Sequence, residues 1–548
     1  MALYYHRGWI YCVLCTTLCC GFVWSSEQLK RFPLMDSKNI LFFPDLLDEK
    51  TFGLHSSVCQ SLVARGHNIT ILGTTSILDN FMTGYHDFDA IFYESLTNSS
   101  NFYSDRILLE NFTSDSVMST LTNLGLHWFR YSNRDSYLKE CSSMLGDQIL
   151  IRKLISSNFD KIVCDVTFPC CSIIARYINV SFVNFASKGP LGSRHFRWYY
   201  VPNVLSIVPE FMSGFTNRMT LGQRLQNVLL YLHSVVVYDY WMFGAYDNMK
   251  SKHGVLPSER TFEIVGKADL LLLNIDFTIE FPRPYMPNVI FVGGILARKP
   301  SKLNKGLESF LHTSVDGVIV VSLNSHSIFN PELLHSISMS LATLPQKVLW
   351  NENGYLPQTL GGGNMEIFKA NELNDVLGQG NVKAFLFNGN IDEAYMAIFH
   401  AVPSVAIPTS AEESEIALRL EDKGISISLN LQKLTGTELS TAVNHAVNNN
   451  TFRERVLWWS EVHHDFHQIF LPPIDRTVFW IEHVMQFGGG HLRSAAFKLN
   501  TVQYFLLDIM SFMLVCVVFL VLVIRMLCLK YCNKKLSTKQ QEMKLKQH

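Results

Sequence analysis

The segment from 382 to 418 constrains the fold of this 548-residue chain more than any other. An apolar run at 384–387 is followed by a turn at 388–390, a helical stretch that ends near His400, and a second apolar strand at 403–408. In such a β–turn–α–β unit, a ligand lies where the carboxyl end of the strand meets the N-terminus of the helix. The segment therefore predicts an α/β fold with a ligand site at this turn.

The same pattern recurs in both halves of the chain. Residues 38–72 are typical of strand, helix and strand, and 159–185 repeats that order. A proline-rich stretch at 281–288 and the Gly pair at 293–294 interrupt the pattern, which starts again at Gly317. We therefore predict two doubly wound, Rossmann-like domains that face a shared cleft through the carboxyl ends of their strands.

We place these domains at residues 27–294 and 295–490. Within the first, an apolar helix is expected over the sheet at 225–248, because this stretch has few helix breakers. Within the second, the pattern predicts that 452–486 is helical. No internal repeat of solenoid length is present.

The two ends of the chain indicate its compartment. An apolar stretch after Arg7 has the form of a secretory signal peptide, which we assign to 1–26. Residues 504–524 are apolar apart from Asp508 and long enough for one transmembrane helix, preceded by a pre-membrane segment at 491–503.

The remaining residues, 525–548, form a basic tail, and positive residues stay on the cytosolic side of a membrane. We expect a single-pass type I protein of the endoplasmic reticulum membrane with the bulk of the chain lumenal. Lysines third and fifth from the end resemble a di-lysine retrieval signal, with a solvated basic tail as the alternative. Five sequons fit a lumenal glycoprotein, at Asn68, Asn98, Asn111, Asn179 and Asn449.

Composition excludes some classes of function. The formal net charge is −1, without a long single-sign block before the tail, which argues against a nucleic-acid partner. Of 12 cysteines, five fall in the predicted lumenal part, and this odd number predicts buried free thiols rather than a disulfide framework. We find neither a phosphate-binding P-loop nor the His/Asp spacing of a metal site, and we expect no cofactor and no metal.

The segment at 382–418 resembles the donor-sugar signature of the UDP-glycosyltransferases of the UDP-glucuronosyltransferase type. Further similar blocks are 38–72, 159–185, 276–294 and 491–514, in the order of the family. The resemblance implies the glycosyltransferase B fold and inverting transfer of a hexose or glucuronic acid from a UDP-sugar to small lipophilic acceptors. It also implies that this chain is a divergent member, because its donor signature is degenerate.

The catalytic positions of the family are only partly kept. Its base, a His, aligns with Thr51, whose hydroxyl is no base near neutral pH, while the Asp that orients this His aligns with Asp165. His55 lies one helical turn from the required place, and we expect it to be structural. Asp165 has a simpler interpretation as a turn or N-cap residue.

The donor positions depart further from the family. Gly389 and Ser325 are kept; Ser325 lies in a Gly-Ser turn of the family that reads Asn324-Ser325 here. The family's uracil-stacking Trp, nearby Gln, phosphate-contacting His, second Gly, ribose-binding Glu and sugar-binding Asp-Gln pair align with Ala370, Leu373, Asn388, Asn390, Met396 and Glu412-Glu413. Each lost buried hydrogen bond or stack is worth on the order of 1–3 kcal/mol.

These changes leave three functions open. The first is an active transferase with a UDP-sugar donor and a lipophilic acceptor as partners. The second, which the lost donor contacts favour, is a pseudoenzyme that acts as a binding or hetero-oligomer partner of active relatives. Whether the chain forms a homo- or a hetero-oligomer is left open by the sequence. The third is a lumenal binder of hydrophobic ligands that uses the aromatic-rich segment 187–240, although aromatics at this density more often form core.

Overall fold

The structure, a computed structural model, describes residues 36–44, 52–74, 88–94, 134–189, 192–323, 331–352 and 364–545. The first half forms a sheet of seven parallel strands in the order β3-β2-β1-β4-β5-β6-β7. Its strands are β1 (Asn39–Phe43), β2 (Asn68–Thr74), β3 (Asp89–Tyr93), β4 (Lys161–Asp165), β5 (Phe182–Ala186), β6 (Leu271–Leu273) and β7 (Val289–Phe291).

The second half forms a sheet of six parallel strands in the order β10-β9-β8-β11-β12-β13. Its strands are β8 (Val318–Ser322), β9 (Lys347–Asn351), β10 (Met365–Phe368), β11 (Val382–Phe387), β12 (Ser404–Ala406) and β13 (Ser426–Ser428). Both strand orders reverse direction beside the first strand of their sheet, which is the doubly wound arrangement predicted from the sequence.

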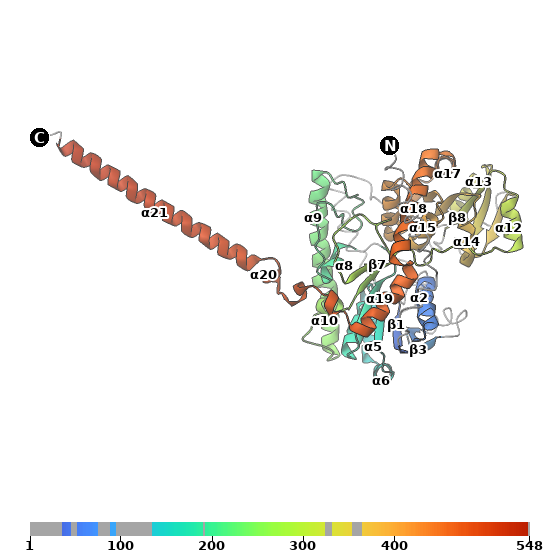
Figure 1. Ribbon diagram of the computed structural model, residues 1–548, viewed down its shortest axis with the longest axis horizontal. Coiled ribbons are helices and arrows are strands. Elements are labelled where there is room, and N and C mark those ends of the chain that lie inside the picture. Colours follow the sequence, from blue (N-terminus) through green and yellow to red (C-terminus); the bar gives the residue numbers. More distant parts are fainter. Residues whose placement is uncertain are drawn as a thin grey trace, which may run out of the picture.

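Helices connect the strands and cover the sheets (Figure 1). In the first half they are α2 (Phe52–Ala64), α5 (Arg134–Gly146), α6 (Gln148–Ser156), α7 (Pro169–Tyr177), α8 (Ser193–Trp198), α9 (Leu221–Val236), the π-helix η4 (Val237–Met242), α10 (Phe243–Lys252) and α11 (Thr261–Gly266). In the second half they are α12 (Lys305–His312), α13 (Pro331–Ala342), η5 (Ala370–Glu372), α14 (Leu373–Leu377), α15 (Ile391–Phe399), α16 (Ala411–Asp422), η6 (Leu431–Lys433) and α17 (Gly436–Asn448).

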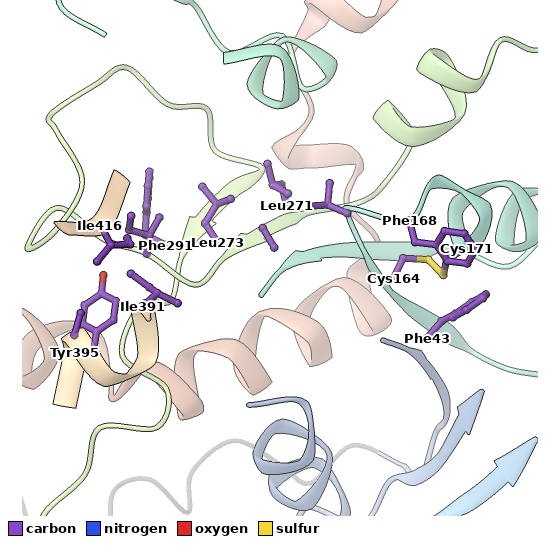
Figure 2. Packing of buried hydrophobic residues seen from close by; sticks show 14 of the residues in the cluster. Phe43, Cys164, Phe168, Cys171, Leu271, Leu273, Phe291, Ile391, Tyr395 and Ile416 are labelled. Atoms are coloured by element: carbon purple, nitrogen blue, oxygen red, sulfur yellow. A yellow bond between two sulfur atoms is a disulfide. The ribbon is translucent and has the colours of Figure 1, made fainter. Parts of the chain in front are cut away.

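One hydrophobic core runs through both halves. Leu271 and Leu273 of the first sheet belong to the same buried cluster as Ile391 and Tyr395 of α15 (Figure 2). At the junction, a side chain on Gly293 would clash with the Tyr395 hydroxyl, so only glycine fits where α15 meets the first domain. The two domains are therefore packed against each other at the base of the expected cleft.

A buried ion-pair network adds to this interface. Arg419 of α16 donates from Nε to Glu280 Oε1 at 3.0 Å and from Nη1 to Glu415 Oε2 at 2.5 Å. The other oxygen of Glu415 accepts from the Met212 backbone N–H at 2.7 Å. Because all three charged side chains are buried, each compensates the desolvation cost of its partners.

The predicted helical stretch at 452–486 consists of two helices. The first, α18 (Asn450–Phe470), ends at Leu471, which has a φ of 72°, and α19 (Pro473–Phe487) begins after Pro472. Proline ends helices because it lacks an N–H and clashes with the preceding turn, and the pair at 472–473 was the missed signal. The break lets α19 return to the first domain, where it packs on α2.

The C-terminal part leaves the two domains as a long helix. After the short turns η7 (Gly490–Leu492), η8 (Ala495–Lys498) and α20 (Thr501–Tyr504), α21 (Leu507–Leu545) projects away from them (Figure 1). Two helical stretches, Leu507–Lys535 and Leu221–Lys252, are long and apolar enough to cross a membrane by length and composition. The predicted span at 504–524 falls mostly in the first of these, although the helix begins later and extends further.

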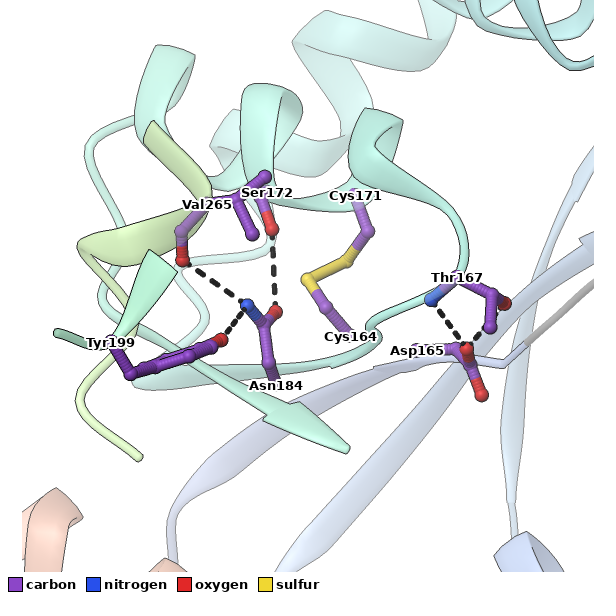
Figure 3. Close-up of a disulfide and its surroundings, with 8 residues drawn as sticks. All are labelled: Cys164, Asp165, Thr167, Cys171, Ser172, Asn184, Tyr199 and Val265. Carbon is purple, nitrogen blue, oxygen red and sulfur yellow. Dashed lines mark hydrogen bonds between the residues drawn. A yellow bond between two sulfur atoms is a disulfide. The ribbon is translucent and has the colours of Figure 1, made fainter. Parts of the chain in front are cut away.

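The prediction of free thiols in the first domain is wrong. Cys141 of α5 is bonded to Cys170 of α7, and Cys164 of β4 is bonded to Cys171 of α7. The count of five was odd because Cys59, buried on α2, stays free. The disulfides were hard to recognise because the neighbouring residues Cys170 and Cys171 are bonded to cysteines in two different elements. The first bond fixes α7 to α5, and the second fixes α7 to the strand that carries Asp165 (Figure 3).

Peptide mapping without reductant is expected to recover the two linked pairs, Cys141–Cys170 and Cys164–Cys171, with Cys59 alkylated only after unfolding. The double variant Cys141→Ala/Cys170→Ala should lose about 2–4 kcal/mol of unfolding free energy, because the link restricts the unfolded chain. The control Cys59→Ala removes a buried thiol without breaking a link and should cost less. Alkylation of all five thiols in the folded protein would contradict the pairing.

Candidate functional site

A row of hydrogen bonds crosses from the first sheet to the second at the carboxyl ends of the strands. Ser187, which follows β5, donates from Oγ to Asp165 Oδ2 at 2.6 Å. Asn274, which follows β6, donates from Nδ2 to the Ser187 carbonyl at 3.0 Å and to Asp392 Oδ1 of α15 at 2.9 Å. These four residues are buried, so the row forms a polar floor between the two domains.

Asp165 lies at the end of β4, as the sequence predicted. Its Oδ1 accepts from the Thr167 N–H at 2.9 Å and from Thr167 Oγ1 at 2.5 Å (Figure 3). Together with Ser187, these contacts give the carboxylate three donors from its own domain. Its turn-forming interpretation therefore has direct structural support.

Thr51, the position of the expected base, lies outside the described residues. His55 lies on α2 with its ring edge-on to Phe185 of β5, at 5.4 Å between ring centroids. The imidazole is 2% exposed and packs within the helix–sheet interface. A structural role, as expected from the sequence, fits this position.

The first turn of α15 is capped by the chain itself. Oδ1 of Asn390 accepts from the backbone N–H groups of Asp392 at 2.9 Å and Glu393 at 3.3 Å. Free N–H groups at a helix N-terminus are what make it a binding site for phosphates. At this helix, an anionic ligand would have to displace the Asn390 side chain to reach those two donors.

Two carboxylates share this turn. Burial raises the pKa of Asp392 to about 6, against the lowering effect of the hydrogen bond from Asn274. Glu393 accepts from Ser322 Oγ of β8 at 2.7 Å, and Asn351 of β9 donates to the same hydroxyl at 3.1 Å. The turn thus carries acidic groups where a diphosphate would need positive charge.

Asn388 and Gly389 form the tight connection between β11 and α15. Asn388 donates from Nδ2 to the carbonyl of Ile407, which follows β12, at 3.1 Å and is 1% exposed. Gly389 has a φ of 95°, and a side chain on it would lie 2.7 Å from the Glu413 carbonyl oxygen. Glycine is therefore required at this position for packing alone, whatever the connection binds.

The expected sugar-binding pair lies at the start of α16. Glu413 Oε2 accepts from the Thr409 N–H at 2.8 Å, from Thr409 Oγ1 at 2.6 Å and from the Ser410 N–H at 3.1 Å. These bonds close a capping box with the Ser410 side chain, so the carboxylate points back to its own helix terminus. Glu412 is only half-buried and lies in the same first turn.

The other donor positions are placed as follows. Leu373 is 4% exposed and Met396 is half-buried against the same hydrophobic core, so both contribute to packing. Ala370 opens η5 and is half-buried. Asn324 and Ser325 lie outside the described residues.

The sequence analysis overlooked His463 and His467, which lie one turn apart on α18 and face Asp276. With that carboxylate they place three metal-ligand atoms within 4.8 Å of one another. However, Arg476 donates from Nη2 to His467 Nδ1 at 3.1 Å, so the imidazole proton lies on Nε2, 3.3 Å from Asp276 Oδ2. A metal would need that Nε2 unprotonated, and the geometry therefore favours a hydrogen-bonded network.

Asp276 lies at the centre of that network. Burial would raise the pKa of Asp276, but His467, His463 and Thr278 lower it to about 2. Tyr395 of α15 donates from its hydroxyl to Asp276 Oδ1 at 3.0 Å, and the same hydroxyl accepts from the Asp276 N–H at 2.6 Å. The ionised carboxylate therefore joins the first domain, α15 and α18.

Sequence reasoning found one end of the row, Asp165, but not its other three members. Asp165 and the turn at 388–390 were predicted, whereas Ser187, Asn274 and Asp392 were not considered. Ser187 and Asn274 each follow an apolar strand within one residue, which was an available signal. Strand β6 spans three residues, 271–273, and was not recognised, so the position of Asn274 at the sheet edge was not recognised either.

Known proteins are similar to this chain in both sequence and fold. The profile of the family described as "UDP-glucoronosyl and UDP-glucosyl transferase" matches residues 49–542. Human UDP-glucuronosyltransferase 2B15 is 33% identical over 89% of this chain and 92% of its own length. UDP-glucuronosyltransferase 2A3 of Mus musculus is 32% identical over 89% of this chain and 91% of its own length.

Solved structures agree on the architecture. The calicheamicin glycosyltransferase CalG4 is similar with a TM-score of 0.55 and 18% identity, over 82% of this chain and 99% of that one. The glycotransferase of kitacinnamycin is similar with a TM-score of 0.55 and 15% identity, over 82% of this chain and all of that one. These similarities establish the two-domain glycosyltransferase B fold.

The variant Asp392→Asn is expected to stabilise the protein at neutral pH. The folded pKa of about 6 lies above the usual 3.8, so the protonated carboxyl stabilises the fold below about pH 4, and this contribution is lost as the pH rises through 6. The loss of unfolding free energy amounts to about 2–3 kcal/mol. Melting temperatures of the two proteins should be similar near pH 4, with the variant higher above pH 6.

The matched control is Glu308→Gln, which alters an exposed carboxylate in the first turn of α12. It should leave the pH dependence of the melting temperature unchanged. A wild-type advantage over Asp392→Asn that grows with pH would show that the carboxylate is stabilised in its ionised form, contrary to this account.

Proposed function

The chain belongs to the UDP-glucuronosyltransferase family, and we propose that within this family its transfer of a hexose or glucuronic acid from a UDP-sugar to small lipophilic acceptors is weak or lost. One observation carries the proposal: the side chain of Asn390 occupies the N–H groups of α15 that a diphosphate would use. Family membership supports the donor and acceptor classes. The site supports the loss of donor affinity.

The negative charge around the N-terminus of α15 also supports the loss of donor affinity. Asp392 and Glu393 lie in the first turn, and Glu412 and Glu413 begin the next helix. A UDP-sugar brings two negative phosphates, and desolvated like charges repel strongly. The ring stack and ribose anchor are also replaced, by Ala370 and Met396. A donor would therefore bind this cleft with much lower affinity than a family member with the complete signature.

The acid–base part of the reaction is affected separately. Transfer needs a base to accept the proton of the acceptor hydroxyl, and the expected position holds Thr51. The orienting carboxylate, Asp165, is held by Thr167 and Ser187. Its oxygens therefore already accept hydrogen bonds from these two residues, whereas an orienting carboxylate must accept one from the base. Both donor binding and proton removal are weakened in this proposal.

A turnover assay on the purified full chain tests the proposal. With UDP-glucuronic acid or UDP-glucose and a panel of phenolic and steroid acceptors, release of UDP should remain near background. The combined variant Thr51→His, Asn388→His, Asn390→Gly, Met396→Glu and Glu413→Gln should raise turnover at least tenfold. Wild-type turnover comparable to that of the 33%-identical human relative, in a parallel assay, would contradict the proposal.

Controls separate the two weakened steps. Thr51→His alone restores the expected base but not the donor contacts, so it should remain slow unless UDP-sugar is raised far above ordinary levels. Each variant is checked by its melting temperature. The Glu413 carboxylate closes a capping box, and in Glu413→Gln the amide oxygen must still accept from the Ser410 backbone N–H. A rescue by Thr51→His alone would place the defect in proton removal only.

We further infer an endoplasmic reticulum location with α21 as the single membrane anchor and both domains lumenal. The basic residues that follow the apolar stretch of α21 support this orientation, and so do the five sequons. The two disulfides also support it, because they persist in oxidising compartments. Recovery of the linked cysteine pairs from native membranes tests the orientation, since a cytosolic first domain would keep them reduced.

A further inference from the structure

The buried side of helix α9 carries the polar residues Gln226, Asn227 and Ser234 beside Leu230. Asn227 is fully buried and accepts from the Glu210 N–H at 2.6 Å, while its amide donates to the carbonyls of Leu205 at 2.8 Å and Val208 at 2.9 Å. Two turns further on, Ser234 is also fully buried and donates from Oγ to Glu210 Oε1 at 3.4 Å, besides a bond to the Tyr231 carbonyl within the helix. These bonds hold the helix on its domain through polar contacts.

Its outward side is apolar over the whole length of the helix and into η4. The side chains recur every three or four residues, so they form one stripe, and each is at least 46% exposed. The stripe consists of Leu221, Leu225, Leu229, Leu232, Val236 and Tyr240. A helix on the surface of a water-soluble domain has the opposite arrangement, with its apolar face toward the core. The stretch expected to be helical at 225–248 is helical, and the side of α9 that faces solvent is its apolar one.

Helix α9 lies on the side of the molecule from which the anchor helix, α21, leaves (Figure 1). Tyr200, in the turn after α8, packs against Phe497 at 4.7 Å and Tyr504 at 5.2 Å between ring centroids. The apolar sequence of α21 begins three residues after Tyr504. Three residues span at most about 10 Å, so a membrane entered by α21 must begin close to this side of the first domain.

We propose that α9 lies in the surface of the same bilayer leaflet that α21 enters, with its apolar stripe among the lipid acyl chains. The helix does not cross the membrane, because Asn227 and Ser234 bind it to the domain. Arg224 is exposed beside the stripe, where its long side chain reaches lipid phosphates. A bilayer fits better than a second copy of the chain, because α21 already brings lipid to this side.

The proposal rests on membrane anchoring by α21, and the experiment separates the two. The full chain is reconstituted in phosphatidylcholine vesicles with single cysteines labelled by an environment-sensitive fluorophore and quenched by doxyl-labelled lipids. In a background without Cys528 and Cys532, a label on Cys516 reports on α21. With Cys516 also replaced, Leu229→Cys reports on the stripe, and Val315→Cys, at a residue 96% exposed in the second domain, is the control.

We expect strong lipid quenching and a blue-shifted emission at positions 516 and 229, with at least threefold less quenching at 315. Quenching at 516 without quenching at 229 would overturn the α9 proposal and leave the anchor intact. A blue shift at 229 that depends on protein density and resists lipid quenching would identify a second copy as the occupant. Quenching at neither position would overturn both the anchor and the proposal.

Discussion

The hydrogen bonds of helix α15 connect the two sheets, and the geometry of the cleft depends on them. Asp392 binds Asn274 of the first domain, Glu393 binds Ser322 of its own sheet, and Tyr395 binds Asp276. Within one helix of nine residues, two of these contacts, those of Asp392 and Tyr395, thus fix the two domains relative to each other. Because these groups are buried, their loss would leave unpaired polar atoms in the interface. The helix that is expected to bind the donor therefore also holds the two domains together.

This double role has a consequence for chemistry. A helix N-terminus binds phosphate when its N–H groups are free and nearby charges are positive. In α15, Asn390 satisfies two of those groups, those of Asp392 and Glu393, and the side chains of the same two residues are acidic. The features that secure the domain interface are thus unfavourable for an anionic donor. Fold stability and donor binding are separable here, which explains how the family architecture persists with an altered signature.

The sequence predicted the architecture well because its signals are local. The apolar strands at 39–43, 161–165 and 382–387 and the helices between them follow from periodicity and breakers. The strands β6 and β7, of three residues each, were not recognised. The break before α19 was missed although Pro472 and Pro473 marked it, because the apolar pattern continues on both sides.

The site was less predictable because it is assembled from distant parts of the chain. Asn274 and Asp392 are separated by 118 residues, and neither has a pattern that names its partner. The disulfides present the same difficulty, since adjacent cysteines at 170 and 171 bind different elements. The outward stripe of α9 reads as an ordinary apolar helix until burial shows which face is inside. The local sequence predicts where helices and strands lie, whereas which of their faces contact each other is known only from the folded structure.

The most direct test of the central claim is the affinity for UDP alone, measured by titration calorimetry of the purified chain. The account predicts a dissociation constant of about 1 mM or weaker for the wild type, which corresponds to about −4 kcal/mol. The variant Asn388→His/Asn390→Gly should bind at least tenfold more tightly, because it frees the first turn of α15 and adds a donor. Low-micromolar binding of UDP to the wild type would contradict the claim.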